Sequence, residues 1–348
     1  MNAATGRCAP GVFGRAFMVA GILCITAMQP SAAEELIVYG STPADEWAVY
    51  KTAFEAEHPD ITLTQSGDSS GIIIARVLAE RGSPKADVIF DMPASGILTL
   101  VAEGLIEPYA PAGLSDIDPR LIDLHEPPHW FAFSGYAALV CYNREEGAIR
   151  NIPPPTSWRD LADPVYRGQI TMSDPNSSGT GMMLVAGILA TFGEEEGWAF
   201  LDRLHENIAF YTHSGSKPCK LAGAGEYTIG LSNENAPVRE IKGGAPIDPI
   251  IPAEGLFWEI ASVGMLKGTD NEEAAKRFLD WASSRRANEL FAEHWSIIAI
   301  RDLAKPRPYL PENFLDRLQV IDFQWVSDNR ERIGAEWQRR YATKIEPE

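Results

Sequence analysis

The sequence predicts an α/β protein whose strands form a largely parallel sheet. Short apolar segments with strand character alternate with segments long enough for helices, at the spacing typical of such folds. Turns rich in serine and threonine recur between a strand and the helix that follows it. The length of 348 residues suits one large domain or two medium ones.

The first third of the chain follows this pattern. Its predicted strands cover 36–40, 61–65 and 86–91, and its predicted helices begin at 43, 72 and 93. Thr42 fits as the N-cap of the first helix, with Pro43 as its first residue. Ligands of such sheets bind at the carboxyl ends of the strands. We therefore expect a binding site there, formed by Ser41, Thr42, Ser69, Ser70 and Asp91.

The second half contains a long run with strand character, 130–143, which predicts a crossing into a second lobe. Further strands are predicted over 169–172, 208–211 and 227–232, and helices over 182–192, 219–224 and 272–284. An aromatic turn is predicted at 255–259, before the apolar segment 260–266. The last of these helices has Ala275, Phe278, Leu279 and Trp281 on one face. Beyond Pro306 the chain is polar, and we expect its helical pieces to pack on the outside of a lobe.

One stretch, 173–181, has the composition of an anion site. Three hydroxyls and two glycines lie within 177–181, where a strand ends and an apolar helix begins. The first N–H groups of a helix lack internal partners, and the helix dipole favours negative charge there. An ordinary helix cap is the alternative. A similar turn, 212–218, adds Lys217, so the candidate residues of this lobe are Ser177, Ser178, Gly179, Thr180, Ser214 and Ser216.

The N-terminus predicts export. Arg7 and Arg15 precede an apolar run, 16–28, that is too short to span a bilayer, and small residues follow at 31–33. We expect cleavage after Ala33 and a periplasmic location, with lipid attachment at Cys24 as the alternative. No later stretch has the sequence of a membrane span.

The net charge of the chain narrows the classes of possible partner. The formal net charge is −18, and removal of a segment with two arginines and no acid gives −20. This negative net charge argues against nucleic acid and anionic membranes as partners.

Two cysteines remain after cleavage, Cys141 and Cys219, which either pair in an oxidising compartment or stay as buried thiols.

Catalytic motifs are not apparent, and we expect no enzymatic activity. The segment 67–71 superficially resembles a serine-protease motif but lacks glycine after the serine. The histidines are scattered along the chain. His125 and His129 have helical spacing, but Pro127 and Pro128 between them forbid a helix. We therefore predict no catalytic residue, no metal site and no cofactor.

Several segments together resemble the periplasmic substrate-binding proteins of ABC importers. They are the strand and turn at 36–42, the strand 86–91, Glu107-Pro108-Tyr109, the turn 173–181, and 214–218 with 225–230. The resemblance lies in the branch that binds ferric iron, sugar phosphates, thiamine and 2-aminoethylphosphonate. It implies a type II fold of two α/β lobes joined by two hinge strands. It also implies a monomer that delivers its ligand to an inner-membrane ABC permease.

The resemblance suggests domain boundaries. We expect a signal peptide over 1–33, a first lobe over 34–134 and 253–305, a second lobe over 135–252, and a C-terminal helical extension over 306–348. The hinges are expected near 133–135 and 252–255, where the chain passes between the lobes.

The predicted ligand is 2-aminoethylphosphonate or a close organophosphonate. The hydroxyl-rich turns would hold its anionic end, and Asp91, Glu234 and Trp258 would meet its ammonium group. Glu259 either contacts the same group or is exposed to solvent. A sugar phosphate, read by Asn233, Glu234 and Asn235, is one alternative. Ferric iron is another, although the chain has no adjacent tyrosine pair. A ligand-sensing role is a third.

Overall fold

The computed structural model describes residues 33–347, together with Gly6 and Gly11. The predicted export signal, including Cys24, therefore lies almost entirely outside the described residues. Within the described part of the chain, no helix has both the length and the apolar composition needed to cross a bilayer.

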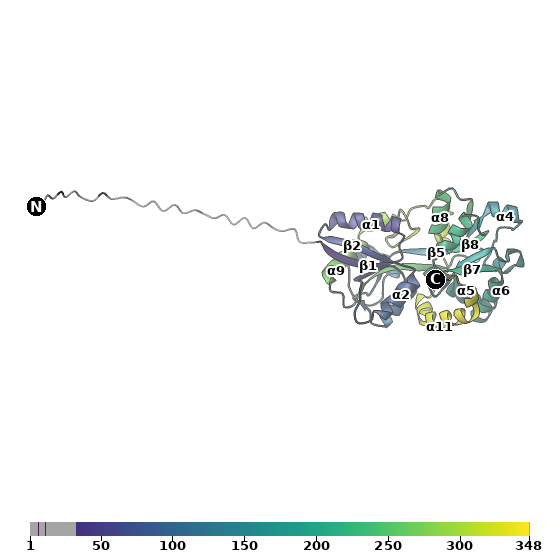
Figure 1. The fold of residues 1–348 in the computed structure, drawn as a ribbon, viewed down its shortest axis with the longest axis horizontal. Helices are drawn as coiled ribbons and strands as arrows, with labels where there is room; N and C mark the ends of the chain where they lie inside the picture. The colour runs from purple at the N-terminus through teal and green to yellow at the C-terminus, as the bar shows by residue number, and fades with distance from the viewer. Residues whose placement is uncertain (1–5, 7–10, 12–32, 348) are drawn as a thin grey trace, which may run out of the picture. The chain divides into compact units, whose positions relative to one another are not determined.

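The first lobe is built on a mixed sheet with the strand order β2-β1-β3-β10-β5 (Figure 1). Strands β1, β2 and β3 are parallel, whereas β10 is antiparallel to β3 and to β5. These strands are β1 (Glu34–Gly40), β2 (Ile61–Gly67), β3 (Val88–Pro93), β5 (Phe131–Asn143) and β10 (Trp258–Leu266), with short β4 (Ile106–Glu107) and β11 (Ile297–Ile298) beside them.

The second lobe continues from β5 in the order β5-β8-β6-β7, with β9 also paired to β5. Its strands are β6 (Ile170–Ser173), β7 (Ile208–Thr212), β8 (Ile229–Asn233) and β9 (Ile247–Ile250). Here β6 is parallel to β7 and β8, whereas β5 is antiparallel to β8 and β9. The largely parallel sheet expected from the sequence is thus mixed in both lobes, because the connecting strands run against their neighbours.

Helices flank both parts of the sheet (Figure 1). Those of the first lobe are α1 (Ala44–Glu57), α2 (Ser70–Ala79), α3 (Ala94–Ala102), α9 (Glu272–Ser283) and α10 (Arg285–Phe291). Those of the second lobe are α4 (Arg144–Arg150), α5 (Gly179–Phe192), α6 (Glu194–Asn207), α7 (Lys217–Gly223) and α8 (Asn235–Lys242). The architecture is the two-lobed α/β fold predicted from the sequence.

Strand β5 belongs to both lobes. Its residue Ala137 pairs with Trp258 of β10, and the next residue, Ala138, pairs with Asn233 of β8. The change of partner thus falls slightly later than the hinge predicted at 133–135. The second connection runs between the end of β9 and the start of β10, across the predicted hinge at 252–255. The hinge positions and lobe boundaries stay predictions.

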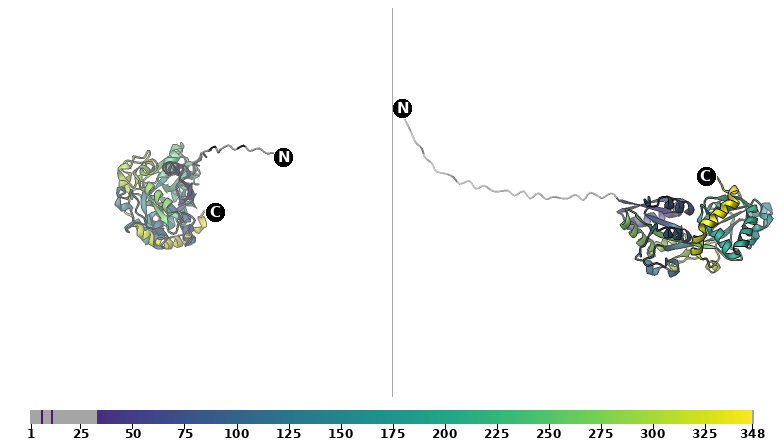
Figure 2. Two further views of the ribbon diagram at one scale, coloured as in Figure 1. Left: turned by 90° about the vertical axis from the view of Figure 1, so that its left-hand side faces the viewer. Right: turned by 90° about the horizontal axis from the view of Figure 1, so that it is seen from below.

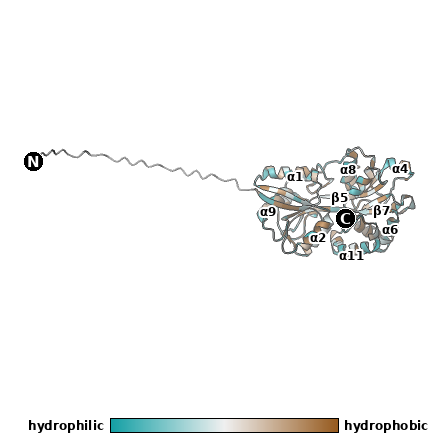
Figure 3. Ribbon diagram, in the orientation of Figure 1, coloured by the Kyte–Doolittle hydropathy of each residue, from teal (hydrophilic) through white to brown (hydrophobic). Residues whose placement is uncertain are grey.

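The core follows the apolar faces predicted from the sequence, and apolar colour is prominent in the strands of the sheet (Figure 3). Phe90 of β3 stacks on Phe133 of β5 with ring centroids 4.4 Å apart. The residues predicted to face inward from α9 are all buried: Ala275, Phe278, Leu279 and Trp281. Burial of such side chains is the main favourable contribution to folding of each lobe.

A smaller apolar cluster in the second lobe surrounds a disulfide. Cys141 of β5 and Cys219 of α7 are bonded and fully buried, among Ala137, Leu139 and Ala222. The sequence left open whether these cysteines pair. The bond links the long connecting strand to a helix next to the hydroxyl-rich turn 212–218.

The C-terminal helix α11 (Phe323–Tyr341) contacts both lobes, and Figure 2 shows it running between them. It packs on α3, where Thr99 and Ser327 share a hydrogen bond of 3.1 Å. It also packs on the second lobe, where the Asn176 side chain donates to the Gly334 carbonyl at 3.2 Å. The expectation that this extension packs on one lobe is therefore wrong.

Candidate functional site

A cavity of about 360 Å³ lies between the lobes, at the carboxyl ends of β1, β3 and β8. Most of the residues predicted from the sequence line it: Ser41, Thr42, Ser69, Ser70, Asp91, Ser178, Gly179, Thr180, Ser214, Ser216 and Asn233. Asn235, predicted for a sugar phosphate, also lines the cavity, together with side chains that the sequence did not single out, notably Glu46, Tyr136, Arg239 and Trp295. Ligand contact by any of these residues stays a prediction.

The N-terminus of α5 lies at the centre of the second-lobe wall. Ser178 is its N-cap, and its Oγ accepts from the Gly181 N–H at 3.3 Å. The Gly179 N–H donates to Ser70 Oγ of the first lobe at 2.8 Å. Ser178 is thus a helix cap and a cavity residue at once, and the helix end already holds an oxygen acceptor from the opposite lobe.

Polar contacts between described residues join the lobes across the cleft. Besides the Ser70–Gly179 bond, the Gly71 N–H donates to the Ser177 carbonyl at 3.0 Å. Glu46 of α1 and Arg239 of α8 form an ion pair. The structure therefore has the cleft closed.

Glu46 and Arg239 are the charged pair that sequence reasoning missed. Each lies inside a helix, far from the other along the chain, and neither belongs to a motif. Glu46 is 3% exposed, and its Oε2 has no hydrogen-bond partner among the described residues. A buried carboxylate is costly unless it is paired, and the ion pair that the other oxygen makes with Arg239 offsets part of this cost.

A bulge directs Asp91 toward the first-lobe wall. Ser262 of β10 pairs with Met92, while Val263 pairs with Phe90, so Asp91 is left out of the ladder. Its φ of 60° is in the left-handed region. Thr42 Oγ1 donates to Asp91 Oδ2 at 3.1 Å. Thr42 is therefore not the N-cap predicted for α1, because its hydroxyl is used by Asp91 and Pro43 holds that position.

The pKa of Asp91 provides a test of this geometry. Burial raises it from 3.8 to about 7, opposed by the hydrogen bonds from Thr42 and Ser41. The unfolded chain loses the proton near its ordinary pKa, so the folding contribution of Asp91 is largest below about pH 4 and declines up to about pH 7. Asparagine tolerates the left-handed backbone conformation of this position. We therefore expect the free energy of unfolding of Asp91→Asn at pH 8 to exceed that of the wild type by more than about 1 kcal/mol.

Urea denaturation at pH 5 and pH 8 measures this difference. Burial also raises the pKa values of Glu234 and Glu259 to about 7. The variant should therefore keep part of the decline with pH, and Glu234→Gln is the matched comparison. If the free energy of unfolding changed between pH 5 and pH 8 by the same amount in the wild type and in Asp91→Asn, the raised pKa assigned to Asp91 would be contradicted.

Three predicted site residues do not line the cavity. Ser177 is turned away, its hydroxyl donating to the His213 carbonyl at 3.2 Å. Glu234 is fully buried and accepts from the Ala137 N–H at 2.8 Å. Trp258 packs edge-on against Phe323 and donates to the Gln319 carbonyl at 2.8 Å. The structure thus does not support direct ligand contact by these side chains.

Neither expectation for Glu259 is correct. Its side chain is 3% exposed and lies outside the cavity lining. Its oxygens accept from Ser95 Oγ at 2.7 Å and from the Ile260 N–H at 2.9 Å.

Lys217, predicted beside the third hydroxyl-rich turn, pairs with Glu346 of the C-terminal segment. The carboxylates facing the cavity are therefore those of Glu46, Asp68 and Asp91.

Comparison with known proteins identifies the family. Residues 83–322 match the model of the bacterial extracellular solute-binding proteins. The chain belongs to this family. Its members are extracytoplasmic binding proteins, and the related proteins include periplasmic components of ABC transporters. The predicted transport role is thereby confirmed at the level of the family.

Three curated relatives are similar to this chain over most of its length. An uncharacterized protein of Haemophilus influenzae is 33% identical over 263 residues, 75% of this chain and 76% of the relative. A probable ABC transporter periplasmic-binding protein of Sinorhizobium fredii, y4fP, is 26% identical over 333 residues, 90% and 87% of the two chains. A putative 2-aminoethylphosphonate-binding periplasmic protein of Salmonella paratyphi A is 23% identical over 280 residues, 77% and 79% of the two chains.

Solved structures confirm the type II two-lobed fold. The periplasmic binding protein AfuA of Actinobacillus pleuropneumoniae, solved with exogenous fructose-6-phosphate bound, has a TM-score of 0.81 and 28% identity, covering 89% of this chain and 99% of that chain. Iron-bound HitA of Pseudomonas aeruginosa has a TM-score of 0.73 and 19% identity, covering 87% and 99%. The second likeness shows the fold alone.

Proposed function

We propose that this solute-binding protein captures a small organic phosphate or phosphonate for ABC-type import, and that a phosphorylated sugar or polyol fits its cavity best. The observation that carries the proposal is the composition of the cavity wall. Hydroxyls from both lobes and the N-terminus of α5 line the cavity, and so do Glu46, Asn233, Asn235 and Arg239. The first set suits a phosphate group, and the second suits hydroxyls.

The size of the cavity supports the larger ligand. Its 360 Å³ would hold about a dozen waters by volume, more room than 2-aminoethylphosphonate needs. Glu46, Asn233, Asn235 and Arg239 line the cavity and offer acceptors and donors for the hydroxyls of a polyol. The similarity to AfuA, whose structure was solved with fructose-6-phosphate, agrees with this choice.

The second candidate is 2-aminoethylphosphonate, the ligand predicted from the sequence. The carboxylate of Asp91 and the ring of Trp295 both line the cavity, and together they suit an ammonium group. A putative binder of this compound is among the relatives. Against it, Glu234 and Trp258, which were expected to complete the ammonium site, lie outside the cavity lining.

The cavity is less suited to ferric iron. Tyrosine phenolates and carboxylates are the donors that hard Fe(III) prefers. Among the described residues, Tyr136 is the tyrosine in the lining, and burial holds its pKa well above the ordinary value. A neutral phenol is a weak ligand for this ion, and the carboxylates of the lining are already engaged by other side chains of the protein.

Calorimetric titration of the protein with a ligand panel tests the proposal. The panel contains fructose 6-phosphate, glucose 6-phosphate, 2-aminoethylphosphonate, inorganic phosphate and ferric citrate. We expect binding of a sugar phosphate that is at least tenfold tighter than binding of inorganic phosphate. Tight binding of 2-aminoethylphosphonate alone would select the second candidate, and binding of ferric citrate alone would overturn the proposal.

Removing two hydroxyls of the anion end should weaken binding. We expect the double variant Ser178→Ala, Thr180→Ala to bind the selected ligand at least tenfold more weakly, because each lost hydrogen bond to a charged group is worth roughly 1.5–3 kcal/mol. Loss of the Ser178 cap should also lower stability by about 1 kcal/mol. Thr180→Ser, which keeps its hydroxyl, is the control. Unchanged affinity in the double variant would remove this turn from the site.

We further propose that the chain is exported by the predicted signal at 1–33 and works as a monomer with an inner-membrane ABC permease. The periplasmic or extracellular setting of the family supports this assignment, as does the buried Cys141–Cys219 disulfide. Mass spectrometry of the protein from a periplasmic extract tests it. A mature N-terminus at Glu34 is expected, whereas a lipid-modified Cys24 would indicate the alternative anchor.

A further inference from the structure

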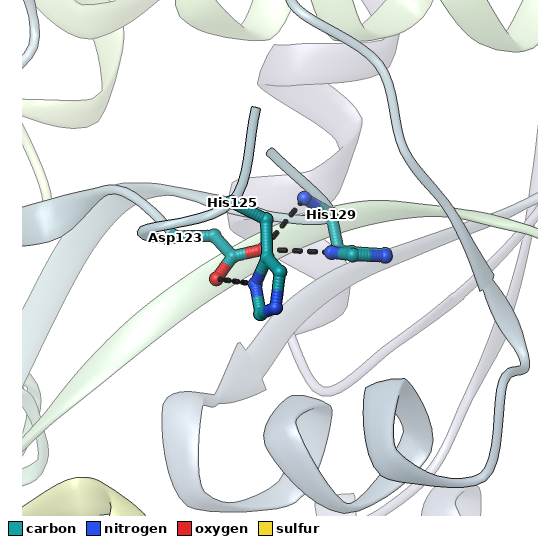
Figure 4. Close-up of side chains that lie close together, drawn as sticks. All are labelled: Asp123, His125 and His129. Atoms are coloured by element: carbon teal, nitrogen blue, oxygen red, sulfur yellow. Dashed lines mark hydrogen bonds and ion pairs between the residues drawn. The ribbon is translucent and has the colours of Figure 1, made fainter. Parts of the chain in front are cut away.

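A compact histidine cluster lies outside the cavity, in the loop that leads into β5. Figure 4 shows Asp123, His125 and His129 with their side chains together. The sequence appeared to separate these histidines, since two prolines exclude the helix that their spacing suggests. The structure shows instead that the loop folds back, with the Asp123 N–H donating to the Trp130 carbonyl at 3.1 Å. The expectation that the histidines are scattered is therefore wrong for this pair.

One carboxylate holds both imidazoles. Asp123 Oδ1 lies 3.0 Å from His125 Nδ1, and Asp123 Oδ2 lies 2.8 Å from His129 Nδ1. The backbone N–H of His129 also donates to Oδ2 at 2.8 Å, which fixes the carboxylate plane. The two rings are nearly perpendicular, with centroids 4.9 Å apart. Three possible ligand atoms, one from each residue, lie within 4.8 Å of one another.

These separations match the needs of a small transition-metal ion. A tetrahedral zinc ion has bonds of about 2.0–2.2 Å to nitrogen and oxygen, which places its ligand atoms about 3.3 Å apart. Each Nδ1 already lies 2.8–3.0 Å from a carboxylate oxygen of Asp123, close to this spacing, and one ligand atom from each residue lies within 4.8 Å of the other two. Coordination requires each neutral imidazole to carry its proton on Nε2, so that the metal replaces the hydrogen bonds to Asp123.

The three side chains of the cluster differ in solvent exposure. The Asp123 side chain is 5% exposed, that of His129 22%, and that of His125 65%. The carboxylate is thus anchored in the protein while one imidazole faces solvent. Three protein ligands would leave a coordination position open on the exposed side.

We propose that Asp123, His125 and His129 form a binding site for a divalent transition-metal ion such as Zn²⁺, separate from the ligand cavity. Phe131, two residues beyond His129, and the cavity residue Tyr136 are about 16 Å apart along β5. The metal site is therefore at the end of the first lobe remote from the cleft. It does not depend on the ligand proposed for the cavity.

Calorimetric titration of untagged protein with ZnCl₂, and separately with MgCl₂, tests the site. We expect one Zn²⁺ per chain, no comparable Mg²⁺ binding, and at least tenfold weaker Zn²⁺ binding in His125→Ala. This variant should fold normally because the side chain is largely exposed. Glu126→Gln, which changes an exposed acid of the same loop, is the matched control and should bind as the wild type does.

Two further measurements separate this site from the cavity. Visible absorption of added Co²⁺ should show a tetrahedral spectrum in the wild type that is lost in His125→Ala. The double variant Ser178→Ala, Thr180→Ala should keep full Zn²⁺ affinity. Equal Zn²⁺ affinity in wild type and His125→Ala, or absence of Zn²⁺ binding, would overturn the proposal.

Discussion

Replacing Gly71 by alanine is expected to weaken binding of the transported ligand by roughly ten- to a hundredfold while leaving the fold intact. A Cβ at this position would lie 2.2 Å from the Asn176 carbonyl oxygen and 2.8 Å from the Ser177 carbonyl, both on the opposite lobe. Such overpacking costs roughly 1–3 kcal/mol, and each 1.4 kcal/mol is about tenfold in affinity. The clash exists only when the cleft is closed, so the variant penalises the closed state.

Calorimetry with the ligand chosen by the panel measures the loss, and urea denaturation checks the fold. Alanine suits the first turn of α2 better than glycine does, so stability without ligand should not fall. Gly243→Ala is the matched control, since that glycine ends α8 at the surface and does not line the cavity. Wild-type affinity in Gly71→Ala would show that ligand binding does not need the closed contact between α2 and the turn 173–178.

Removing the disulfide with Cys141→Ala and Cys219→Ala together should lower the free energy of unfolding by about 4 kcal/mol. The bonded residues are 78 apart in sequence, so the bond closes a long loop and restricts the unfolded chain strongly. Both side chains are fully buried, and the variant also loses apolar contacts in the cluster around them.

Urea denaturation of the oxidised wild type, the reduced wild type and the double variant measures this effect. The reduced wild type keeps both sulfur atoms and separates the cross-link from the packing. We expect the reduced protein to show most of the loss. Equal stability of the oxidised and reduced forms would contradict a stabilising role for the bond.

Local chemistry allowed much of the cavity to be predicted. The turns at 41–42, 69–70 and 178–180 each combine a strand end, hydroxyl side chains and a helix start within a few residues. In an α/β sheet these turns gather at one edge, so a short-range pattern was enough to place them in the cleft. The alternation of strands and helices likewise predicted the fold class.

The remaining residues depend on contacts that the sequence does not encode locally. Glu46 and Arg239 meet only because the two lobes approach each other. Glu234 lies between the cavity residues Asn233 and Asn235, but its side chain reaches back to the Ala137 N–H of β5. Ligand contact was predicted for Trp258, but the C-terminal segment covers its ring. The path of that segment could not be predicted from the sequence.

The path of that C-terminal segment also constrains how the cleft opens. After Arg301 pairs with Asp118 in the first lobe, the chain crosses the connection between β9 and β10, where Leu318 bridges to Leu256, and α11 then contacts both the second lobe and α3. The lobes are thus tied at three places instead of the two implied by hinge strands alone. Two ties leave a pair of bodies free to swing about the line that joins them, whereas a bridge that lies away from that line resists the swing. Opening of the cleft should then require α11 to shift or release its contacts with one lobe, so these contacts favour the closed arrangement of the hydroxyl-rich turns.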